Sequence, residues 1–249
     1  MDSERDREQD SDQDREQDRE RVPATDTVLI VSGGVAPGEL SGIRVPAARC
    51  VIAADGGVVT ASELGLRVDE LIGDLDSAPA SLQARVAESG GRVRRYRAEK
   101  DATDLELALA AAVSRDPPPR RVIVLGGTGG RLDHLLAGAL LLAAPQWAGR
   151  DATGTDVEAW LGRAKITVIR RAAVLGPAAP GELVTLLAVG GMARGVTTGG
   201  LLYPLRAADL VPGASRGVSN RFVATTATVT VSAGVLLAIQ PGEGGGRRP

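Results

Sequence analysis

Residues 122–131 have the sequence VIVLGGTGGR, in which an apolar, β-branched run is followed at once by a glycine-rich loop. Earlier apolar runs follow the same plan, because a glycine or an aspartate comes within two residues after each of them. These runs are Val28–Val31, Cys50–Ala54 and Leu71-Ile72. Short continuous apolar runs of this kind are typical of strands buried on both faces of a parallel sheet.

Segments with a helical spacing of apolar residues lie between these runs, at about 58–65, 79–90, 102–114 and 132–143. Strands that alternate with helices predict βαβ units. We therefore expect an α/β fold whose N-terminal domain, residues 27–150, is a doubly wound parallel sheet. Ligands of such sheets bind at the carboxyl edge of the strands, where the glycines and aspartates of this chain gather.

After Trp160 the sequence changes to short strand-like runs separated by Gly/Pro turns. The threonines Thr226, Thr228 and Thr230 alternate with apolar residues, which is the period of two expected of a half-buried strand. We expect a C-terminal antiparallel β-sandwich domain over residues 164–241. Residues 148–163 are the expected linker. The expected strands are Lys165–Arg170, Ala172–Leu175, Leu183–Ala188, Ala193–Thr198, Phe222–Val231 and Val235–Ile239.

The two ends of the chain differ from this folded part. Residues 2–21 contain ten acidic residues and five arginines, and they have too little apolar surface to offset the entropy lost on ordering. We expect a disordered charged tail over residues 1–25 and a flexible tail over residues 242–249.

The composition excludes several classes of protein. A single cysteine, Cys50, and a single histidine, His134, argue against a disulfide scaffold and a zinc site, and favour a reducing cytoplasm. The net charge of −2 argues against a nucleic-acid partner. No uncharged apolar stretch of about 18 residues is present, so we expect no membrane-spanning helix and no membrane partner.

Two carboxylates follow the third apolar run, in the sequence Gly73-Asp74-Leu75-Asp76-Ser77. In extended backbone, residues two apart point to the same side, so Asp74 and Asp76 are expected to converge. Paired carboxylates at a sheet edge suit Mg²⁺, which prefers carboxylates, waters and substrate phosphates. The alternative is an Asx turn that satisfies backbone donors after the strand.

A second acidic pair, Asp101 and Asp104, opens the segment with helical spacing that ends near residue 114. Lys100 precedes the pair and is one of only two lysines in the chain, which makes it a candidate phosphate ligand. The alternative is purely local, with Asp101 as the N-cap and Asp104 in the first helical turn.

The glycine-rich loop after residue 125 is the third candidate. Backbone N–H groups of such a loop bind phosphate, and Arg131 adds a planar fork of donors. The loop is neither a Walker A loop nor a dinucleotide fingerprint, which argues against a dinucleotide-dependent oxidoreductase. His134, beside Asp133, is more typical of a supporting residue than of a catalytic one. Together the three candidates predict a site where a divalent metal meets an oligophosphate.

With these residues in view, the chain resembles the thiamine pyrophosphokinase (thiamine diphosphokinase) family. The resemblance spans about residues 27–240 and rests on six motifs that occur in the family's order. They are Ala54-Asp55-Gly56-Gly57, Gly73-Asp74-Leu75-Asp76-Ser77, Lys100-Asp101-Ala102-Thr103-Asp104, Gly129-Gly130-Arg131-Leu132-Asp133-His134, Thr198-Gly199-Gly200-Leu201-Leu202-Tyr203-Pro204-Leu205 and Gly217-Val218-Ser219-Asn220.

The resemblance implies a homodimer with shared active sites, in which a pyrophosphoryl group passes from ATP to the hydroxyethyl oxygen of thiamine and AMP is released. Residues 27–150 are then the catalytic domain that binds the nucleotide and Mg²⁺, and residues 164–241 the domain for thiamine binding and dimerisation. Mg²⁺ is the implied cofactor and ATP the co-substrate. The implied catalytic residues are Asp74, Asp76, Asp101, Asp104 and Asp133, the first four of which also hold the metal. The implied ATP-binding residues are Asp55, Lys100, Gly127, Gly129, Gly130 and Arg131, and the implied thiamine-binding residues are Ser219 and Asn220.

Two departures from the family pattern bear on the substrate. The family often has Asn where this chain has Gly138, and no Trp follows Trp160, which leaves Tyr203 or Phe222 to stack on thiamine. Two alternatives stay open: a pyrophosphokinase for another alcohol, such as a hydroxymethylpterin, and a non-catalytic nucleotide-binding module on the same scaffold.

Overall fold

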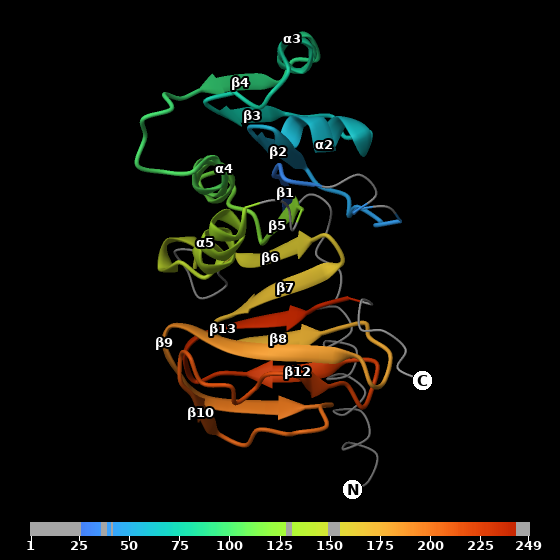
Figure 1. Cartoon of the computed structure of the whole chain (residues 1–249), viewed down its shortest axis with the longest axis vertical. Coiled ribbons are helices and arrows are strands. Elements are labelled where there is room, and N and C mark those ends of the chain that lie inside the picture. The colour runs from blue at the N-terminus through green and yellow to red at the C-terminus, as the bar shows by residue number, and fades with distance from the viewer. Residues whose placement is uncertain (1–25, 36–38, 41, 128–130, 149–154, 243–249) are drawn as a thin grey trace, which may run out of the picture.

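The computed structural model describes residues 26–35, 39–40, 42–127, 131–148 and 155–242. In Figure 1 the strands follow one another along the long axis, and the helices surround only the N-terminal half. The predicted tails over residues 1–25 and 242–249 lie outside the described residues, apart from Gly242. Within the described part of the chain, none of the helices combines the length and apolar character needed to span a membrane.

Parallel strands build the N-terminal half. They are β1 (Thr27–Val31), β2 (Cys50–Ala54), β3 (Glu70–Gly73), β4 (Arg92–Arg95), β5 (Arg121–Gly126) and β6 (Asp156–Leu161). Their spatial order is β4-β3-β2-β1-β5-β6, and every neighbouring pair is parallel. Leu29 and Ile30 point to opposite faces of β1 and both are fully buried, as a sheet covered on both faces requires.

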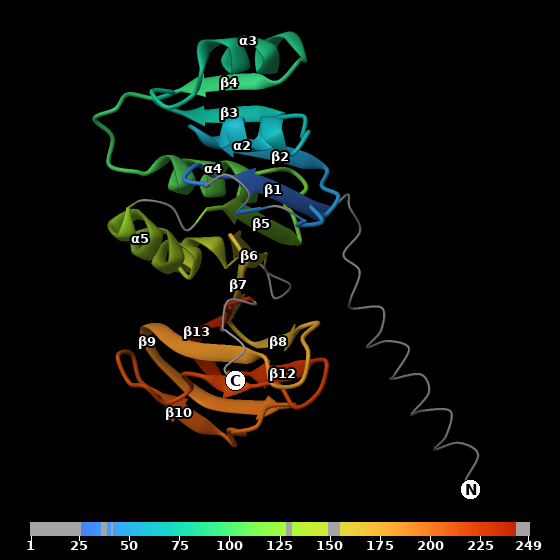
Figure 2. The same cartoon turned by 45° about the vertical axis from the view of Figure 1, so that its right-hand side comes forward.

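Helices cover both faces of these strands. They are α2 (Gly57–Glu63), α3 (Ala80–Glu88), α4 (Asp104–Val113) and α5 (Leu132–Leu142), with a 3₁₀ turn, η3, at Pro145–Trp147. α2 and α3 pack on the face that contains Leu29, whereas α4 and α5 pack on the face that contains Ile30. Figure 2 shows α3 at the β4 end and α5 nearer the C-terminal strands. The predicted doubly wound parallel sheet is confirmed.

The order of the strands creates a switch point between β1 and β5. From β1 the chain continues to β2 on one side, and from β5 it continues to β6 on the other. The loops that leave the two strands therefore diverge, and open α/β sheets bind ligands in the crevice between such loops.

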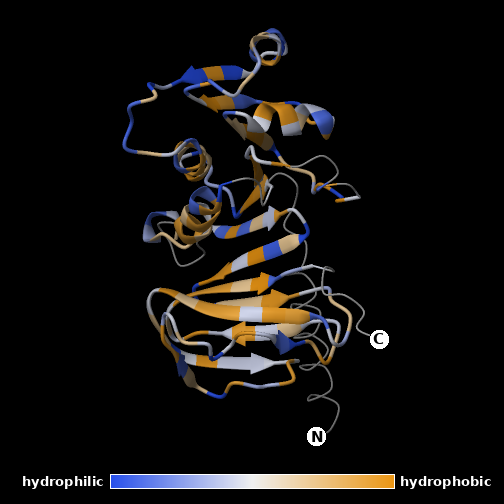
Figure 3. Cartoon of the chain, viewed as in Figure 1, coloured by the Kyte–Doolittle hydropathy of each residue, from blue (hydrophilic) through white to orange (hydrophobic). Residues whose placement is uncertain are grey.

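The C-terminal half is antiparallel. Its strands are β7 (Ala164–Ile169), β8 (Ala172–Leu175), β9 (Leu183–Gly199), β10 (Ala208–Leu210), β11 (Asn220–Arg221), β12 (Ala227–Thr230) and β13 (Ala233–Gln240). They enclose a second core that includes Leu186, Phe222 and Val229, and Figure 3 shows the apolar character of β9 and β13. This confirms the antiparallel sandwich.

A bend in β9 holds the sandwich together. Gly190 and Gly191 have positive φ angles of 70° and 154°, which glycine adopts without steric cost. Before the bend β9 pairs with β11 and β13, and after it β9 pairs with β10, with β12 and, at Arg194, again with β13. The sequence predicted two separate strands here, but β9 continues through the bend at the two glycines and forms one strand.

The predicted linker is wrong for residues 156–161, which form β6. This strand pairs in parallel with β5 and antiparallel with β7, so it joins the two halves into one continuous sheet. Val157 and Ala159 are buried between them. β4 was also not predicted, because its sequence Arg-Val-Arg-Arg carries the charge of an edge strand rather than an apolar run.

Candidate active site

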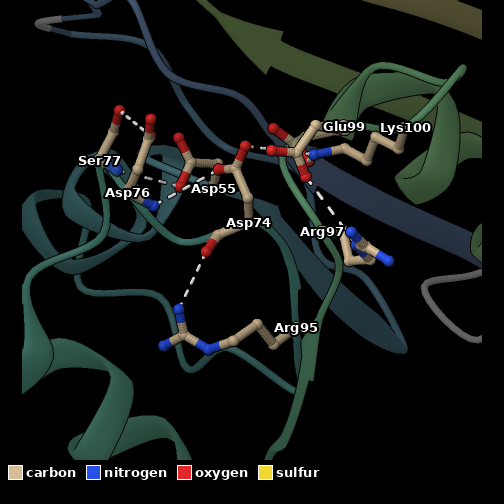
Figure 4. Close-up of polar contacts among 9 residues, drawn as sticks. Asp55, Asp74, Asp76, Ser77, Arg95, Arg97, Glu99 and Lys100 are labelled. Carbon is tan, nitrogen blue, oxygen red and sulfur yellow. Dashed lines mark hydrogen bonds and ion pairs between the residues drawn. The ribbon is translucent and has the colours of Figure 1, made fainter.

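Three aspartates gather at the carboxyl edge of the parallel strands. Asp55 follows β2, Asp74 follows β3, and Asp104 is the first residue of α4. Each offers a carboxylate oxygen, and these oxygens all lie within 4.8 Å of one another. β2 and β3 are paired neighbours in the sheet, so the turns after them bring Asp55 beside Asp74, as Figure 4 shows. We call Asp55, Asp74 and Asp104 the acidic cluster.

Gly73 makes the acidic cluster sterically possible. Its φ angle is +154°, and a Cβ at this position would lie 3.0 Å from Asp55 Cβ and 3.1 Å from Asp104 Oδ1. Both distances are shorter than ordinary van der Waals contact, so any side chain here would push the carboxylates apart. Asp55 itself has a left-handed φ of 44°, a conformation that aspartate adopts more readily than most residues.

Lys100 is the cation that faces the acidic cluster. Its Nζ lies 3.3 Å from Asp74 Oδ2 and 3.0 Å from Asp104 Oδ1, and the side chain is mostly shielded from solvent. Burial disfavours the ammonium, but the Asp104 and Asp74 carboxylates outweigh it and raise the pKa of Lys100. Lys100 is therefore held charged between the two carboxylates.

The Asp104 carboxylate is imperfectly satisfied. Burial, together with the neighbouring Asp74 and Asp55 carboxylates, raises the pKa of Asp104 above its ordinary value although Lys100 opposes the shift. Its Oδ1 is buried and, among the described residues, receives no hydrogen bond, because the contact with Lys100 has the distance but not the angles of one. Buried carboxylate oxygens normally have a donor or a metal.

Asp74 divides its two oxygens between the backbone and the acidic cluster. Oδ1 accepts the Asp76 N–H at 3.4 Å, which is the Asx-turn contact that the sequence offered as an alternative. Oδ2 faces Lys100. Burial would raise the pKa of Asp74, but the Asp76 N–H and the Lys100 ammonium bring it below its ordinary value. Arg95 fixes the turn from behind by donating to the Asp74 carbonyl oxygen at 3.0 Å, as drawn in Figure 4.

Asp76 is not part of the acidic cluster. Leu75 has a φ of +66°, so the backbone is not extended here and the two side chains do not converge as predicted from their spacing. Burial of the Leu75 side chain holds this unusual conformation in place. Asp76 is exposed, and its Oδ1 accepts a hydrogen bond from Ser77 Oγ at 2.9 Å.

Thr103 is the N-cap of α4. Its Oγ1 accepts the Glu106 N–H at 3.2 Å, and the Thr-x-x-Glu spacing is that of a capping box. The alternative in which Asp101 caps the helix is therefore wrong. Asp101 is exposed and lies outside the acidic cluster, whereas Asp104 lies within the first turn and is turned towards Asp74 and Lys100.

Arg131 and Asp133 pair with each other at the exposed start of α5. Two contacts join them, from Nη2 to Oδ2 at 2.5 Å and from Nε to Oδ1 at 3.2 Å. The guanidinium lowers the pKa of Asp133 to about 2. Neither residue touches the acidic cluster. The predicted ligands Gly129 and Gly130 lie outside the described residues.

Gly127 lies at the switch point between β1 and β5. A Cβ there would be only 1.8 Å from the Gly34 carbonyl oxygen in the loop after β1. The two loops therefore approach each other backbone to backbone directly after their strands, at the base of the crevice expected at a switch point.

Of the two predicted thiamine ligands, Asn220 has its side chain bonded within the protein, whereas Ser219 has an exposed side chain. Asn220 is buried, and its amide is committed to the backbone of Tyr203, with Nδ2 donating to the carbonyl at 2.8 Å and Oδ1 accepting the N–H at 3.0 Å. Ser219 has a φ of +58°, its N–H donates to Thr185 Oγ1, and its side chain is exposed. Asn220 thus shapes the loop that presents Ser219.

Comparison with known proteins shows the family to which the chain belongs. The model of the thiamin pyrophosphokinase catalytic domain matches residues 44–150, and that of the thiamin pyrophosphokinase vitamin B1 binding domain matches residues 166–236. The chain belongs to the thiamine pyrophosphokinase family. It is therefore a member of a family of pyrophosphotransferases, and the acidic cluster lies in the part that matches the family's catalytic domain.

Individual relatives agree with this assignment. A thiamine pyrophosphokinase of Bacillus subtilis is 27% identical over 181 residues, which cover 69% of this chain and 77% of the relative. The crystal structure of a family protein from Enterococcus faecalis is 26% identical with a TM-score of 0.72, covering 86% of this chain and 98% of that one. The thiamin pyrophosphokinase of Geobacillus thermodenitrificans is 28% identical with a TM-score of 0.68, covering 88% and 99%.

Sequence reasoning missed three contributors to this site. Asp55 was predicted to bind ATP, whereas the structure places it in the acidic cluster; its position after β2, next to β3, is the signal that could have shown this. Gly73 was part of a motif without a role, although a glycine at a strand end often marks close approach of other groups. Thr103 was passed over as a cap in favour of Asp101.

Proposed function

We propose that this family member is a thiamine diphosphokinase that transfers a pyrophosphoryl group from ATP to thiamine. The thiamine hydroxyethyl oxygen attacks Pβ of ATP and forms the new O–P bond, while the bond from Pβ to the oxygen of AMP breaks. The hydroxyl proton is released, and the products are thiamine diphosphate and AMP. The observation that carries the proposal is the acidic cluster at the carboxyl edge of the family's catalytic domain.

The acidic cluster fits a divalent ion such as Mg²⁺. Its donors are carboxylate oxygens, the ligands that Mg²⁺ prefers, and the buried Asp104 Oδ1 contacts the Lys100 ammonium at 3.0 Å without a well-directed hydrogen bond from any described residue. Asp55, Asp74 and Asp104 would hold the ion. When bound, Mg²⁺ neutralises charge that builds up on the phosphate oxygens. Asp76, beside Asp74 on the same turn, would join through water, because its side chain faces solvent.

The residues around the acidic cluster would position the nucleotide and accept the proton. Gly127, at the switch point, offers backbone close to the expected position of the phosphates. Arg131, whose fork now binds Asp133, can exchange this carboxylate for phosphate oxygens. Asp101 or Asp76 would accept the hydroxyl proton. Both side chains are exposed to solvent, and both residues are close in sequence to members of the acidic cluster. Phosphoryl transfer depends mostly on such positioning and charge neutralisation.

The C-terminal sandwich would supply the thiamine site. Ser219 is exposed on a loop held by Asn220, and Tyr203, 63% exposed, lies against the same Asn220 amide. Tyr203 is therefore available to stack on a thiamine ring in place of the tryptophan that this chain lacks after Trp160. Phe222 is only 1% exposed and belongs to the core, so it is not available for stacking. The cationic thiazolium would be favoured by a site lined with carboxylates.

We propose further that the protein is a cytoplasmic homodimer whose active sites are shared between the two subunits. α5 exposes three leucines at helical spacing, Leu132 at 69%, Leu136 at 55% and Leu140 at 59%. These residues form one apolar stripe beside the Arg131–Asp133 pair. A second copy that covers the stripe would bury the apolar surface and bring its own residues close to the start of α5.

The test is turnover by the purified chain with Mg²⁺, ATP and thiamine. Equal amounts of AMP and thiamine diphosphate are expected, and Asp104→Asn should lower the rate by at least about 10²-fold, by analogy with the loss of an electrostatic group that acts in the transition state. A parallel reaction with a hydroxymethylpterin tests the alternative acceptor. Formation of the pterin diphosphate in place of thiamine diphosphate, or no AMP with either alcohol, would overturn the proposal.

A further inference from the structure

Lys100 holds the place that a divalent ion needs. Its ammonium contacts Asp74 Oδ2 at 3.3 Å and Asp104 Oδ1 at 3.0 Å, and both carboxylates belong to the acidic cluster. Figure 4 shows Lys100 pointing towards Asp74 from the segment that precedes α4. Its side chain is only 15% exposed, so little of its charge is screened by water. In this arrangement one positive charge already offsets part of the charge of the acidic cluster.

A bound dication would compete with the ammonium for these contacts. Mg²⁺ lies about 2.0–2.1 Å from its oxygen ligands. An ion on Asp104 Oδ1 would therefore be at most about 5 Å from Nζ in its present position. At that separation the two cations would repel each other strongly in a site shielded from solvent, and they would compete for the same oxygens.

The position of Lys100 in the chain allows it to leave. Lys100 precedes the Thr103 cap and is four residues before Asp104, so rotation about its own side-chain bonds moves the ammonium without moving α4. A lysine carries its charge on a flexible stem of four carbons with three donors. A nucleotide triphosphate bound with the metal would offer the ammonium new phosphate oxygens close by.

We infer that Lys100 is a displaceable counter-ion of the acidic cluster: it neutralises Asp74 and Asp104 in the metal-free protein and transfers to the phosphates of the nucleotide when a divalent ion takes its place. The inference rests on the proposed function, because it assigns the metal to the acidic cluster. It adds that the protein's own cation competes with the metal until the nucleotide arrives.

The first experiment measures Mn²⁺ and Mg²⁺ binding to the folded chain without nucleotide, by calorimetry. Lys100→Met removes the competing charge and should bind either ion at least about tenfold more tightly than the wild type. Lys100→Arg keeps the charge and should stay within about threefold of the wild type. Lys165→Met is the matched control, because Lys165 is the other lysine of the chain and pairs with Glu158 on β6. Equal or weaker metal binding by Lys100→Met would overturn the inference.

The second experiment needs no substitution in the site. The chain has two lysines, so a protein labelled with ¹³C at lysine Cε gives two signals, and Lys165→Met assigns them. Addition of Mg²⁺ alone should shift the Lys100 signal and leave that of Lys165 in place, and addition of ATP should shift the Lys100 signal again. A Lys100 signal that stays in place at saturating Mg²⁺ and ATP would contradict displacement.

The two proposals can fail separately. Normal thiamine diphosphate formation by the wild type, with metal affinity unchanged in Lys100→Met, would leave the proposed function standing and overturn only the role of Lys100. Tighter metal binding by Lys100→Met in a chain that makes no thiamine diphosphate would do the reverse.

Discussion

The Asp104 carboxylate occupies the space that a side chain on Gly73 would need: a Cβ on Gly73 would lie 3.1 Å from Asp104 Oδ1. The end of β3 and the start of α4 therefore approach each other closely at this point. Because Asp55 Cβ is 3.0 Å from the same point, the absence of a side chain on Gly73 lets the Asp55 and Asp104 carboxylates come together beside Asp74.

Gly73→Ala should therefore weaken Mn²⁺ binding and turnover by at least about tenfold, because the methyl group separates Asp55 from Asp104. The substitution also strains the backbone at a φ of +154°. Gly65→Ala is the matched control: Gly65 also has a positive φ, +68°, but open space around it. It should lose stability without losing metal affinity. Equal metal affinity in the two variants would show that Gly73 is needed only for its backbone conformation and not to make room for the acidic cluster.

Asp55→Asn should lower Mn²⁺ affinity and turnover as strongly as Asp74→Asn, by at least about 10²-fold in rate, because in the proposed site both would supply an oxygen to the same ion. Asp209→Asn serves as the control, since Asp209 accepts the Gly195 N–H in the sandwich, outside the acidic cluster. Metal affinity of Asp55→Asn equal to that of the control would remove Asp55 from the metal site.

Thr103→Ala should lower the free energy of unfolding by about 1 kcal/mol, the usual effect of removing an N-cap hydroxyl. It should also weaken metal binding, since Asp104 lies in the turn that the cap holds. Urea denaturation and Mn²⁺ titration measure the two effects, and Thr103→Ser should restore both. A fully stable Thr103→Ala protein would place the cap elsewhere.

Burial of Cys50 raises the pKa of its thiol to about 11 from an ordinary value of 9.0. Folding therefore favours the protonated thiol, and its contribution to stability is complete below about pH 9 and is lost as the pH rises towards 11. We expect native Cys50 to resist thiol reagents at pH 8. The free energy of unfolding should fall more steeply between pH 9 and 11 in the wild type than in Cys50→Ala. Parallel curves for the two proteins would contradict this.

Leu136→Glu places a charge in the centre of the exposed stripe on α5 and should convert the proposed dimer into a monomer with reduced turnover. Light scattering with size-exclusion chromatography measures the mass. Val211→Glu, at an exposed apolar residue of the sandwich, should remain dimeric. A wild type that is monomeric and fully active would refute the shared active sites.

The sequence predicted the layers of the fold because buried parallel strands such as β1, β2 and β5 are continuous apolar runs. It did not predict β4, whose three arginines suit an edge, and it took β6 for part of a linker. Glu158 lies in the middle of β6 and interrupts its apolar pattern, yet it is buried because Arg121 and Lys165 pair with it. Such pairing depends on partners that only the folded sheet supplies.

The sequence predicted the kind of site more fully than it predicted which residues form it. Carboxylates at strand ends were expected to meet, and Asp74 and Asp104 do so with Lys100 between them. Spacing alone wrongly predicted that Asp76 would converge with Asp74, because the positive φ of Leu75 cannot be seen from a pattern of alternating residues. A role in the reaction stays a prediction for Asp101, Asp133 and Ser219.

The most direct test of the account is the anomalous scattering of Mn²⁺ in crystals grown with a non-hydrolysable ATP analogue. We predict a strong peak within coordination distance of Asp55, Asp74 and Asp104, with Lys100 turned away from them towards the phosphates. A peak held by other residues, with Lys100 still bound to Asp74 and Asp104, would contradict the account.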